Sequence, residues 1–144
     1  MGASYVKYNG HGFWARDAHL EKWLLFLAEE IARQNEREAW AGELEQHFKR
    51  HATGGYNGFV NPKLDEFVPD DQRRLRVVGA STSTIQRLLA LGMEIPPSVS
   101  NAWGVGGEGA YFTRPIETAV LERLGLRFVD LLNGILPPSA SEVL

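Results

Sequence analysis

The stretch DAHLEKWLLFLAEEIARQ, residues 17–34, decides the fold of this chain. Its apolar residues recur at the spacing of one helical face, and Leu25 and Phe26 add apolar surface beside that face. Burying each large apolar side chain contributes roughly 1.5–3 kcal/mol, so a helix of this kind belongs inside a domain. We therefore expect a central helix around which the other helices pack. The residues of its apolar face are Leu20, Trp23, Leu24, Leu27, Ala28 and Ile31.

Composition limits the functions that the chain can have. Its 144 residues, 44% hydrophobic and 23% charged, are typical of one ordinary globular domain. A formal net charge of -3 argues against nucleic-acid or anionic-membrane partners, which recruit broad positive surfaces. The lack of cysteine excludes disulfides, thiolate metal sites and a cysteine nucleophile. Because neither a signal peptide nor a membrane span of ~20 apolar residues is recognisable, we expect a cytoplasmic protein.

Helical periodicity returns in four places after the central helix. The third helix of the chain is expected to turn Leu75, Val78, Thr82, Ile85, Leu88 and Leu89 inward, and the last one Ile116, Val120, Leu124, Phe128, Leu131, Leu132 and Ile135. Gly125 interrupts the last stripe and predicts a close helix crossing. The four predicted helices span 35–54, 70–92, 96 to near 103, and about 115 to about 133. Asn35 and Glu38 form the predicted capping box of the first of these helices.

The remaining segments show no regular pattern. Residues 1–16 contain Gly10 and Gly12 and predict an irregular or extended arm, while 52–69 predict an ordered loop with one helical turn through Leu64 and Phe67. Residues 137–144 predict a flexible tail. Since no stretch alternates with period two, the expected fold is all-α: a single-domain bundle of about five helices over 1–136, with long ordered loops rich in glycine and aromatic residues.

Two histidines offer the clearest alternative to a binding protein. His47 and His51 stand four residues apart, so their rings share a helical face, and Glu43 lies one turn earlier. This spacing can bind a divalent metal, which gives the hypothesis of a small helical metal-dependent enzyme. The pattern His-Glu-x-x-His is absent, and a histidine near a helix end is more often a hydrogen-bonded packing residue. We therefore expect no metal, no other cofactor, no catalytic residue and no enzymatic activity.

Two further motifs favour structural interpretations. The run Gly104-Val105-Gly106-Gly107-Glu108-Gly109 lacks the strand and helix that flank a nucleotide-binding loop, which indicates a connector between helices. Arg73, Arg74 and Arg76 have acidic neighbours, which predicts a solvated helix face with ion pairs.

Aromatic and charged residues concentrate in the glycine-rich connections. We expect Trp14, Phe59 and Phe112 to be plugs that tie these loops to the helical body. Other side chains there suit recognition of a protein, because Tyr and Arg combine a large contact area with polar ends. The predicted partner-binding residues are Arg16, Tyr56, Asn57, Glu108, Tyr111 and Arg114. A structural dimerisation module with Trp40 or Trp103 on an exposed apolar patch is a third hypothesis.

Short pieces of the same loops carry a likeness to a known family. They are Gly12-Phe13-Trp14-Ala15-Arg16-Asp17 followed by Leu20-Glu21-x-Trp23-Leu24; Tyr56-Asn57-Gly58-Phe59-Val60 with Pro62 and Leu64-Asp65; and Gly106-Gly107-Glu108-Gly109 with Phe112-Thr113. In these pieces the chain resembles small bacterial cytosolic proteins that include immunity proteins of polymorphic toxin systems. The resemblance implies a helical protein that binds a secreted or contact-delivered bacterial toxin domain and blocks its active site. An acidic chain would suit a basic toxin through charge steering.

Overall fold

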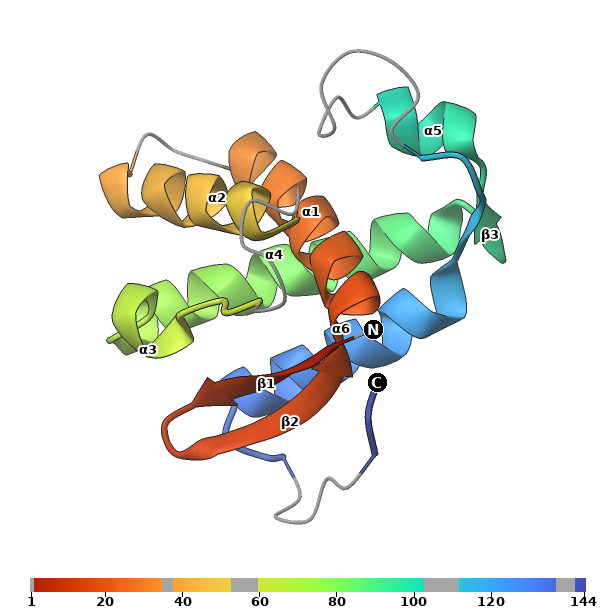
Figure 1. Ribbon diagram of the computed structural model, residues 1–144. Helices are drawn as coiled ribbons and strands as arrows, with labels where there is room; N and C mark the ends of the chain where they lie inside the picture. Colours follow the sequence, from red (N-terminus) through yellow and green to blue (C-terminus); the bar gives the residue numbers. More distant parts are fainter. Residues whose placement is uncertain (1, 35–37, 53–59, 103–111, 137–141) are drawn as a thin grey trace.

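The computed structural model describes residues 2–34, 38–52, 60–102, 112–136 and 142–144, and these residues are mostly helical (Figure 1). The predicted helical domain is confirmed, but two small antiparallel sheets, β1–β2 and β3–β4, add to it. The elements are β1 (Ala3–Tyr8), β2 (His11–Arg16), α1 (Asp17–Gln34), α2 (Ala39–Ala52), α3 (Leu64–Phe67), α4 (Asp71–Ala90), β3 (Glu94–Ile95), α5 (Pro97–Ala102), β4 (Ile116–Glu117) and α6 (Thr118–Leu132).

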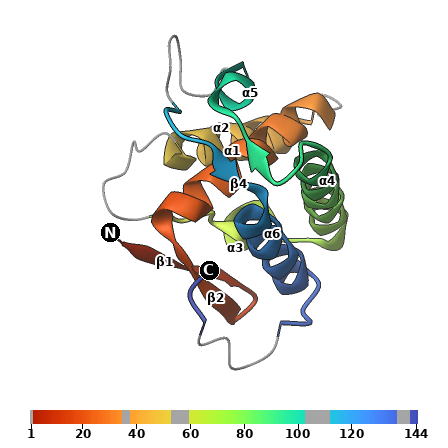
Figure 2. The ribbon, with the colours of Figure 1, turned by 90° about the vertical axis from the view of Figure 1, so that its right-hand side faces the viewer.

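Helix α1 lies at the centre of the domain, as its sequence predicts. It has the predicted bounds and packs against α2, α4 and α6 (Figures 1 and 2). Its first turn is fixed by two contacts with the start of the chain: the Asp17 amide donates to the Gly2 carbonyl at 3.0 Å, and the Ser4 hydroxyl donates to the Asp17 carboxylate at 2.6 Å. The predicted apolar residues of the helix are all buried.

The crossing of α1 and α6 requires a glycine. A Cβ on Gly125 would lie 2.7 Å from the Trp23 ring and 3.0 Å from Cγ1 of Ile85, closer than real side chains approach. Phe128, one turn later, meets Trp23 edge to face with ring centroids 5.8 Å apart. The predicted close crossing at Gly125 is thus confirmed, and it lets the largest side chain of α1 lie inside the core.

The face that α4 turns inward differs from the prediction. Leu75 and Leu89 are 60% and 48% exposed, and Thr82 is exposed as well. Small residues point inward instead, because the hydroxyls of Ser81 and Thr84 donate to carbonyls of their own helix at 2.7 and 2.8 Å and can therefore be buried. The buried residues of α4 are Val77, Ala80, Ser81, Thr84, Ile85 and Leu88. Ile135, placed inward by the same reasoning, is 67% exposed beyond the end of α6.

Residues 3–16 form a β-hairpin, so of the two predicted forms of this arm the extended one is confirmed and the irregular one was wrong. Strands β1 and β2 pair from Ala3 opposite Arg16 to Tyr8 opposite His11. Between them Asn9 and Gly10 both have positive φ, 50° and 81°, as a two-residue hairpin loop requires. The inward residues of β1 are Ser4, Val6 and Tyr8, and the Tyr8 hydroxyl donates to the Val68 carbonyl at 2.9 Å.

The end of the chain lies beside this hairpin. The Leu144 amide donates to the Trp14 carbonyl at 3.0 Å, and the Arg16 amide donates to the Leu144 carbonyl at 3.3 Å. His19 Nδ1 donates to the same carbonyl at 3.0 Å. Residues 142–144, predicted as part of a flexible tail, therefore extend the edge of β2, while 137–141 lie outside the described residues.

Several local predictions match the structure. The helical turn through Leu64 and Phe67 is α3, although it follows Lys63 in the left-handed conformation. Asp70 caps α4, since its carboxylate accepts from the Arg73 amide at 2.8 Å. Gly92, just after α4, has a φ of +93°.

Candidate protein-binding surface

Two of the six predicted partner-binding residues can be placed. Arg16 ends β2 and Arg114 precedes β4, and both are exposed. Tyr56, Asn57, Glu108 and Tyr111 lie outside the described residues.

The outer face of the hairpin carries an exposed aromatic pair. Tyr5 and Trp14 stand opposite each other, are 43% and 45% exposed, and have ring centroids 5.3 Å apart. Because Trp14 uses its backbone carbonyl on Leu144, the two residues form a non-hydrogen-bonded pair, whose side chains lie close together. The prediction that Trp14 is a buried plug was therefore wrong; its neighbours Phe13 and Ala15 point inward instead.

Gly12 shapes this aromatic pair. A Cβ at Gly12 would lie 2.6 Å from the Tyr5 ring and would also collide with the Val6 carbonyl oxygen. Because Gly12 has no Cβ, the Tyr5 ring can lie across β2. Val143, 45% exposed, lies beside Trp14 through the parallel bridge that the chain end forms. We call Tyr5, Trp14 and Val143 the hairpin patch.

Three hollows share His19 in their lining, and Val143 of the hairpin patch lines two of them. The largest, about 600 Å³, also includes Arg16 and Val143. The second, about 290 Å³, reaches Pro115, the neighbour of Arg114. The third, about 190 Å³, lies between Arg16 and α6. We call the charged residues of these hollows the charged rim: Arg16, Asp17, His19, Glu21, Lys22, Glu117, Arg123 and Glu142.

The charged rim carries both signs of charge. Burial raises the pKa of Glu21, the Asp17 charge raises it further, and Lys22 opposes both effects. Glu142 lies 3.9 Å from both Arg123 and Arg127. A partner that covers this rim can form ion pairs of either polarity around the apolar hairpin patch.

The side chains of both histidines of α2 form hydrogen bonds with the backbone of Asn61. Their rings are in contact, tilted by 52° with centroids 4.4 Å apart, and both are buried. His47 Nε2 donates to the Asn61 carbonyl at 2.7 Å, while His51 Nδ1 accepts from the Asn61 amide at 3.3 Å. Glu43 is exposed. Among the described residues no cluster of three or more His, Asp or Glu side chains is placed to hold a metal ion.

Burial lowers the pKa of His47, and the charges of Lys63 and Arg50 lower it further. The hydrogen bond to Asn61 and the charge of Glu66 act in the opposite direction. His47 therefore favours the neutral form, in which it packs against His51.

The arginines of α4 form the ion-paired face that the sequence predicts. Arg74 lies 3.2 Å from Asp71, and Arg76 lies 3.5 Å from Glu38. Arg73 lies 5.0 Å above the Trp40 ring, whose Nε1 donates to Glu38. Trp40 is thus half-buried and engaged within the domain, while Trp103 lies outside the described residues.

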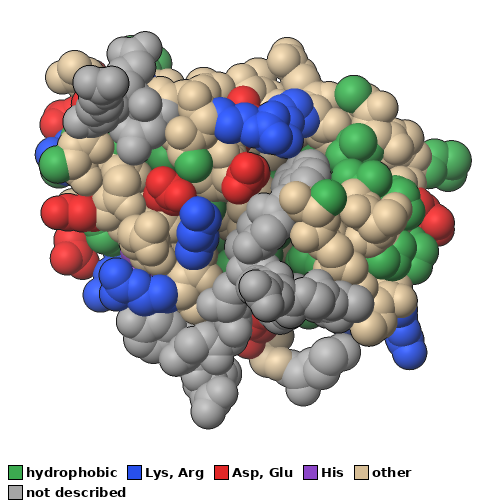
Figure 3. All heavy atoms as spheres, turned by 90° about the horizontal axis from the view of Figure 1, so that it is seen from above, with side chains coloured by type: hydrophobic (Ala, Val, Ile, Leu, Met, Phe, Trp, Pro, Cys, Tyr) green, Lys and Arg blue, Asp and Glu red, His purple; other side chains and the backbone are tan. Residues whose placement is uncertain are grey.

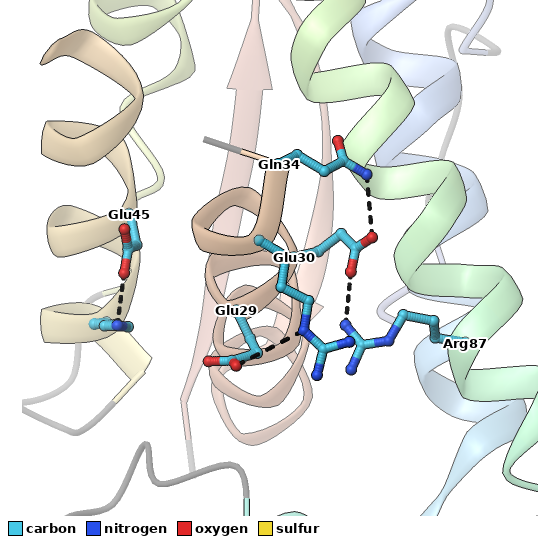
Figure 4. Close-up of polar contacts among 7 residues, drawn as sticks. Glu29, Glu30, Gln34, Glu45 and Arg87 are labelled. Atoms are coloured by element: carbon cyan, nitrogen blue, oxygen red, sulfur yellow. Dashed lines mark hydrogen bonds and ion pairs between the residues drawn. The ribbon is translucent and has the colours of Figure 1, made fainter. Parts of the chain in front are cut away.

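A buried ion pair joins α1 to α4 (Figure 4). Glu30, 6% exposed, accepts from Arg87 at 2.6 Å and from the Gln34 amide at 3.1 Å. Each oxygen of the Glu30 carboxylate therefore accepts one hydrogen bond. These groups support the packing of two helices and leave the Glu30 carboxylate little access to a ligand.

Phe112 is a buried plug, as predicted. Asn101 fixes it from α5, because its side chain donates to the Phe112 carbonyl at 3.0 Å and accepts from the Phe112 amide at 2.8 Å. Phe59, the third predicted plug, lies outside the described residues.

Hydrophobic side chains also gather at the end of the molecule where α4, β3 and α5 meet (Figure 3). The exposed large ones there are Leu89, Leu91 and Met93, the last 88% exposed. They differ from the hairpin patch in containing no aromatic pair.

Comparisons with protein-family models, with curated proteins and with solved structures found no match to this chain. No helix in the described part has both the length and the apolar character needed to cross a membrane. The surface that the structure assembles around Arg16 includes Tyr5, His19 and Val143, which the sequence did not predict as partner-binding residues; His19 was a candidate third ligand for the metal hypothesis. The dipeptide Asn9-Gly10 was the available signal, because it predicts a hairpin and hence which residues face outward.

Proposed function

We propose that this protein is a non-enzymatic, cytoplasmic binding protein that neutralises a protein partner by covering the partner's active site. The observation that carries the proposal is the exposed Tyr5–Trp14 pair beside Arg16, at the edge of the hollows lined by His19. Tyr, Trp and Arg are the residues that most often dominate binding energy in protein interfaces, where they pack in desolvated centres with polar rims.

The arrangement of the surface supports binding to a protein. An apolar centre, the hairpin patch, is bordered by a rim of both charges, which is the usual anatomy of a protein interface. The hairpin is anchored to the domain through Ser4, Tyr8 and the chain end, so its face is preorganised.

The class of partner comes from the resemblance to immunity proteins. We infer a bacterial toxin domain made in the same cell, whose active site this protein occludes. The most direct candidate for the partner is the product of a large reading frame directly upstream of the coding sequence.

Growth rescue tests the proposal. Cells that express the upstream product should stop growing, and co-expression of this chain should restore growth and allow both proteins to be purified together. The double variant Tyr5→Ala/Trp14→Ala should lose both effects. Leu75→Ala/Leu89→Ala is the matched control, because it removes two exposed apolar side chains from α4 and should protect like the wild type. Failure of the wild-type chain to protect would contradict the proposal.

A further inference from the structure

We propose that the partner segment seated on the hairpin is an extended peptide stretch with an acidic residue on each side of an apolar one. This inference rests on the proposed function and specifies the chemistry of the partner. It follows from the cations around the hairpin patch, from their spacing, and from the acids of the charged rim.

Two cations lie on the outer face of the hairpin. Lys7 and Arg16 form no ion pair with another described residue. Both are exposed on the same outward face as the Tyr5–Trp14 pair. In the described part of the chain, these two cations therefore flank an apolar centre with no carboxylate at ion-pair distance from either, which is complementary to a segment with the opposite charge.

The spacing of the hairpin defines the segment. Lys7 lies two residues beyond Tyr5 on β1, and Arg16 lies two residues beyond Trp14 on β2. Because the strands are antiparallel, the two cations stand at opposite ends of the aromatic pair, about 14 Å apart along the strands at roughly 3.4 Å per residue. An extended peptide places carboxylates at positions i and i+4 about 14 Å apart on one face, with residue i+2 facing the aromatic pair.

The charged rim favours a peptide over a nucleic acid. Aromatic rings flanked by cations can also stack bases and contact phosphates. Here, however, Asp17 and Glu21 line the largest hollow beside Arg16, and Glu117 and Glu142 line the other two. These carboxylates would repel a continuous phosphate backbone. A peptide with two acids and an apolar centre can instead place its few charges on Lys7 and Arg16.

Peptide titration of the full-length chain tests the inference. The probes are acetylated and amidated Glu-Thr-Leu-Thr-Glu and its twin Lys-Thr-Leu-Thr-Lys, added at up to millimolar concentration while backbone amide NMR shifts of the hairpin are followed. The glutamate peptide should shift the Tyr5, Lys7 and Trp14 amides and bind about five-fold more tightly than the lysine peptide, as expected for two exposed ion pairs.

Charge reversal provides the control. The variant Lys7→Glu/Arg16→Glu should prefer the lysine peptide. Arg33→Glu/Lys63→Glu changes the net charge equally at exposed cations on other elements and should keep the wild-type preference. The inference is overturned if neither peptide binds, if the lysine peptide binds as well as the glutamate peptide, if the hairpin variant keeps the wild-type preference, or if an oligothymidylate binds more tightly than either peptide.

The two proposals fail separately. If wild type and Lys7→Glu/Arg16→Glu both rescue growth against the upstream product, the acidic segment is wrong while the proposed function stands. If the wild type does not rescue, the proposed function is wrong whatever the peptides show.

Discussion

The arginines of α4 and the cations of the hairpin are the same kind of residue in opposite situations. Arg74, Arg76 and Arg87 each lie within 3.5 Å of a carboxylate, and the Arg87 partner is buried. Lys7 and Arg16 have no ion partner among the described residues and flank exposed aromatic rings. The first set stabilises helix packing, while the second is free to bind. Positive charge alone therefore does not locate a binding surface; the contacts around it do.

The two tryptophans of these regions show the same contrast. Trp23 is fully buried between α1, α6 and Ile85, whereas Trp14 is 45% exposed on the hairpin. Substitutions in the interior should lower the free energy of unfolding, and substitutions on the hairpin should impair binding. The following predictions test whether interior residues determine stability and hairpin residues determine binding.

The largest effect on stability is expected at the α1–α6 crossing. Gly125→Ala places a methyl group against the Trp23 ring and should lower the free energy of unfolding by about 1–3 kcal/mol. The matched control is Gly79→Ala on the exposed side of α4, where no atom lies within 4 Å of the new Cβ and better helix propensity should add about 0.5–1 kcal/mol. Urea unfolding monitored by circular dichroism measures both. Equal effects of the two substitutions would contradict the close crossing.

A smaller loss is expected at the buried ion pair. Glu30→Gln removes the charge that Arg87 contacts and should lower the free energy of unfolding by about 1–2 kcal/mol. This is less than for a fully buried ion pair, because the Arg87 side chain is 26% exposed. Glu29→Gln is the control one residue earlier, since Glu29 lies 4.0 Å from an Arg33 that is 53% exposed and should change stability by less than about 0.5 kcal/mol (Figure 4). Similar urea midpoints for the two variants would show that burial of Glu30 has no energetic consequence.

Acid should weaken the histidine pair. Burial lowers the pKa of His47 below its ordinary value of 6.5, so between 6.5 and the lower folded value the unfolded chain binds a proton that the folded chain does not. Stability should be constant above pH 7 and fall as the pH drops through this window. Glu21, whose pKa is raised above 4.5, acts in the opposite direction at lower pH.

Urea midpoints at several pH values, compared between the wild type and His47→Gln, isolate the histidine contribution. The glutamine amide can still donate to the Asn61 carbonyl but does not titrate. The variant should lose most of the fall in stability between pH 7 and pH 5.5. An unchanged pH profile would contradict the assignment to His47.

The smallest effect on stability is expected on the hairpin. Lys7→Ala/Arg16→Ala removes two exposed side chains without ion partners among the described residues, so the free energy of unfolding should change by less than about 0.5 kcal/mol. The affinity for the partner should nevertheless fall about five-fold, as expected from the loss of two exposed ion pairs. A clear loss of stability would mean that these cations support the fold and would remove the contrast with α4.

Local sequence patterns predicted the centre of the fold because a fully buried helix leaves an unmistakable apolar pattern. The bounds of α1 and the crossing at Gly125 follow from that pattern. The inward face of α4 was not predicted correctly. Large residues such as Leu75 outweigh small ones such as Ser81 when apolar periodicity is used to find the buried face. The close packing of α4 instead favours the small residues.

The hairpin and its patch were harder to predict for two different reasons. Gly10 and Gly12 on their own predict only an irregular or extended arm, whereas Asn9-Gly10 between alternating residues indicates a hairpin. The contact between Trp14 and the chain end joins residues far apart in sequence, which no local pattern reveals. Arg16 and Arg114 are both exposed, and the position of His19 beside Arg16 depends on the tertiary fold, which no local pattern reveals.

In a variant with Trp40→Phe and Trp103→Phe, the two remaining tryptophans of the chain, Trp14 and Trp23, are optical reporters of opposite exposure. A quencher dissolved in water reaches the half-exposed indole of Trp14 but not the fully enclosed indole of Trp23. Covering the hairpin should therefore protect part of the tryptophan emission from iodide without altering the fraction that is already shielded. Loss of the core would expose that shielded fraction as well, so one spectroscopic titration can distinguish docking of a partner from unfolding.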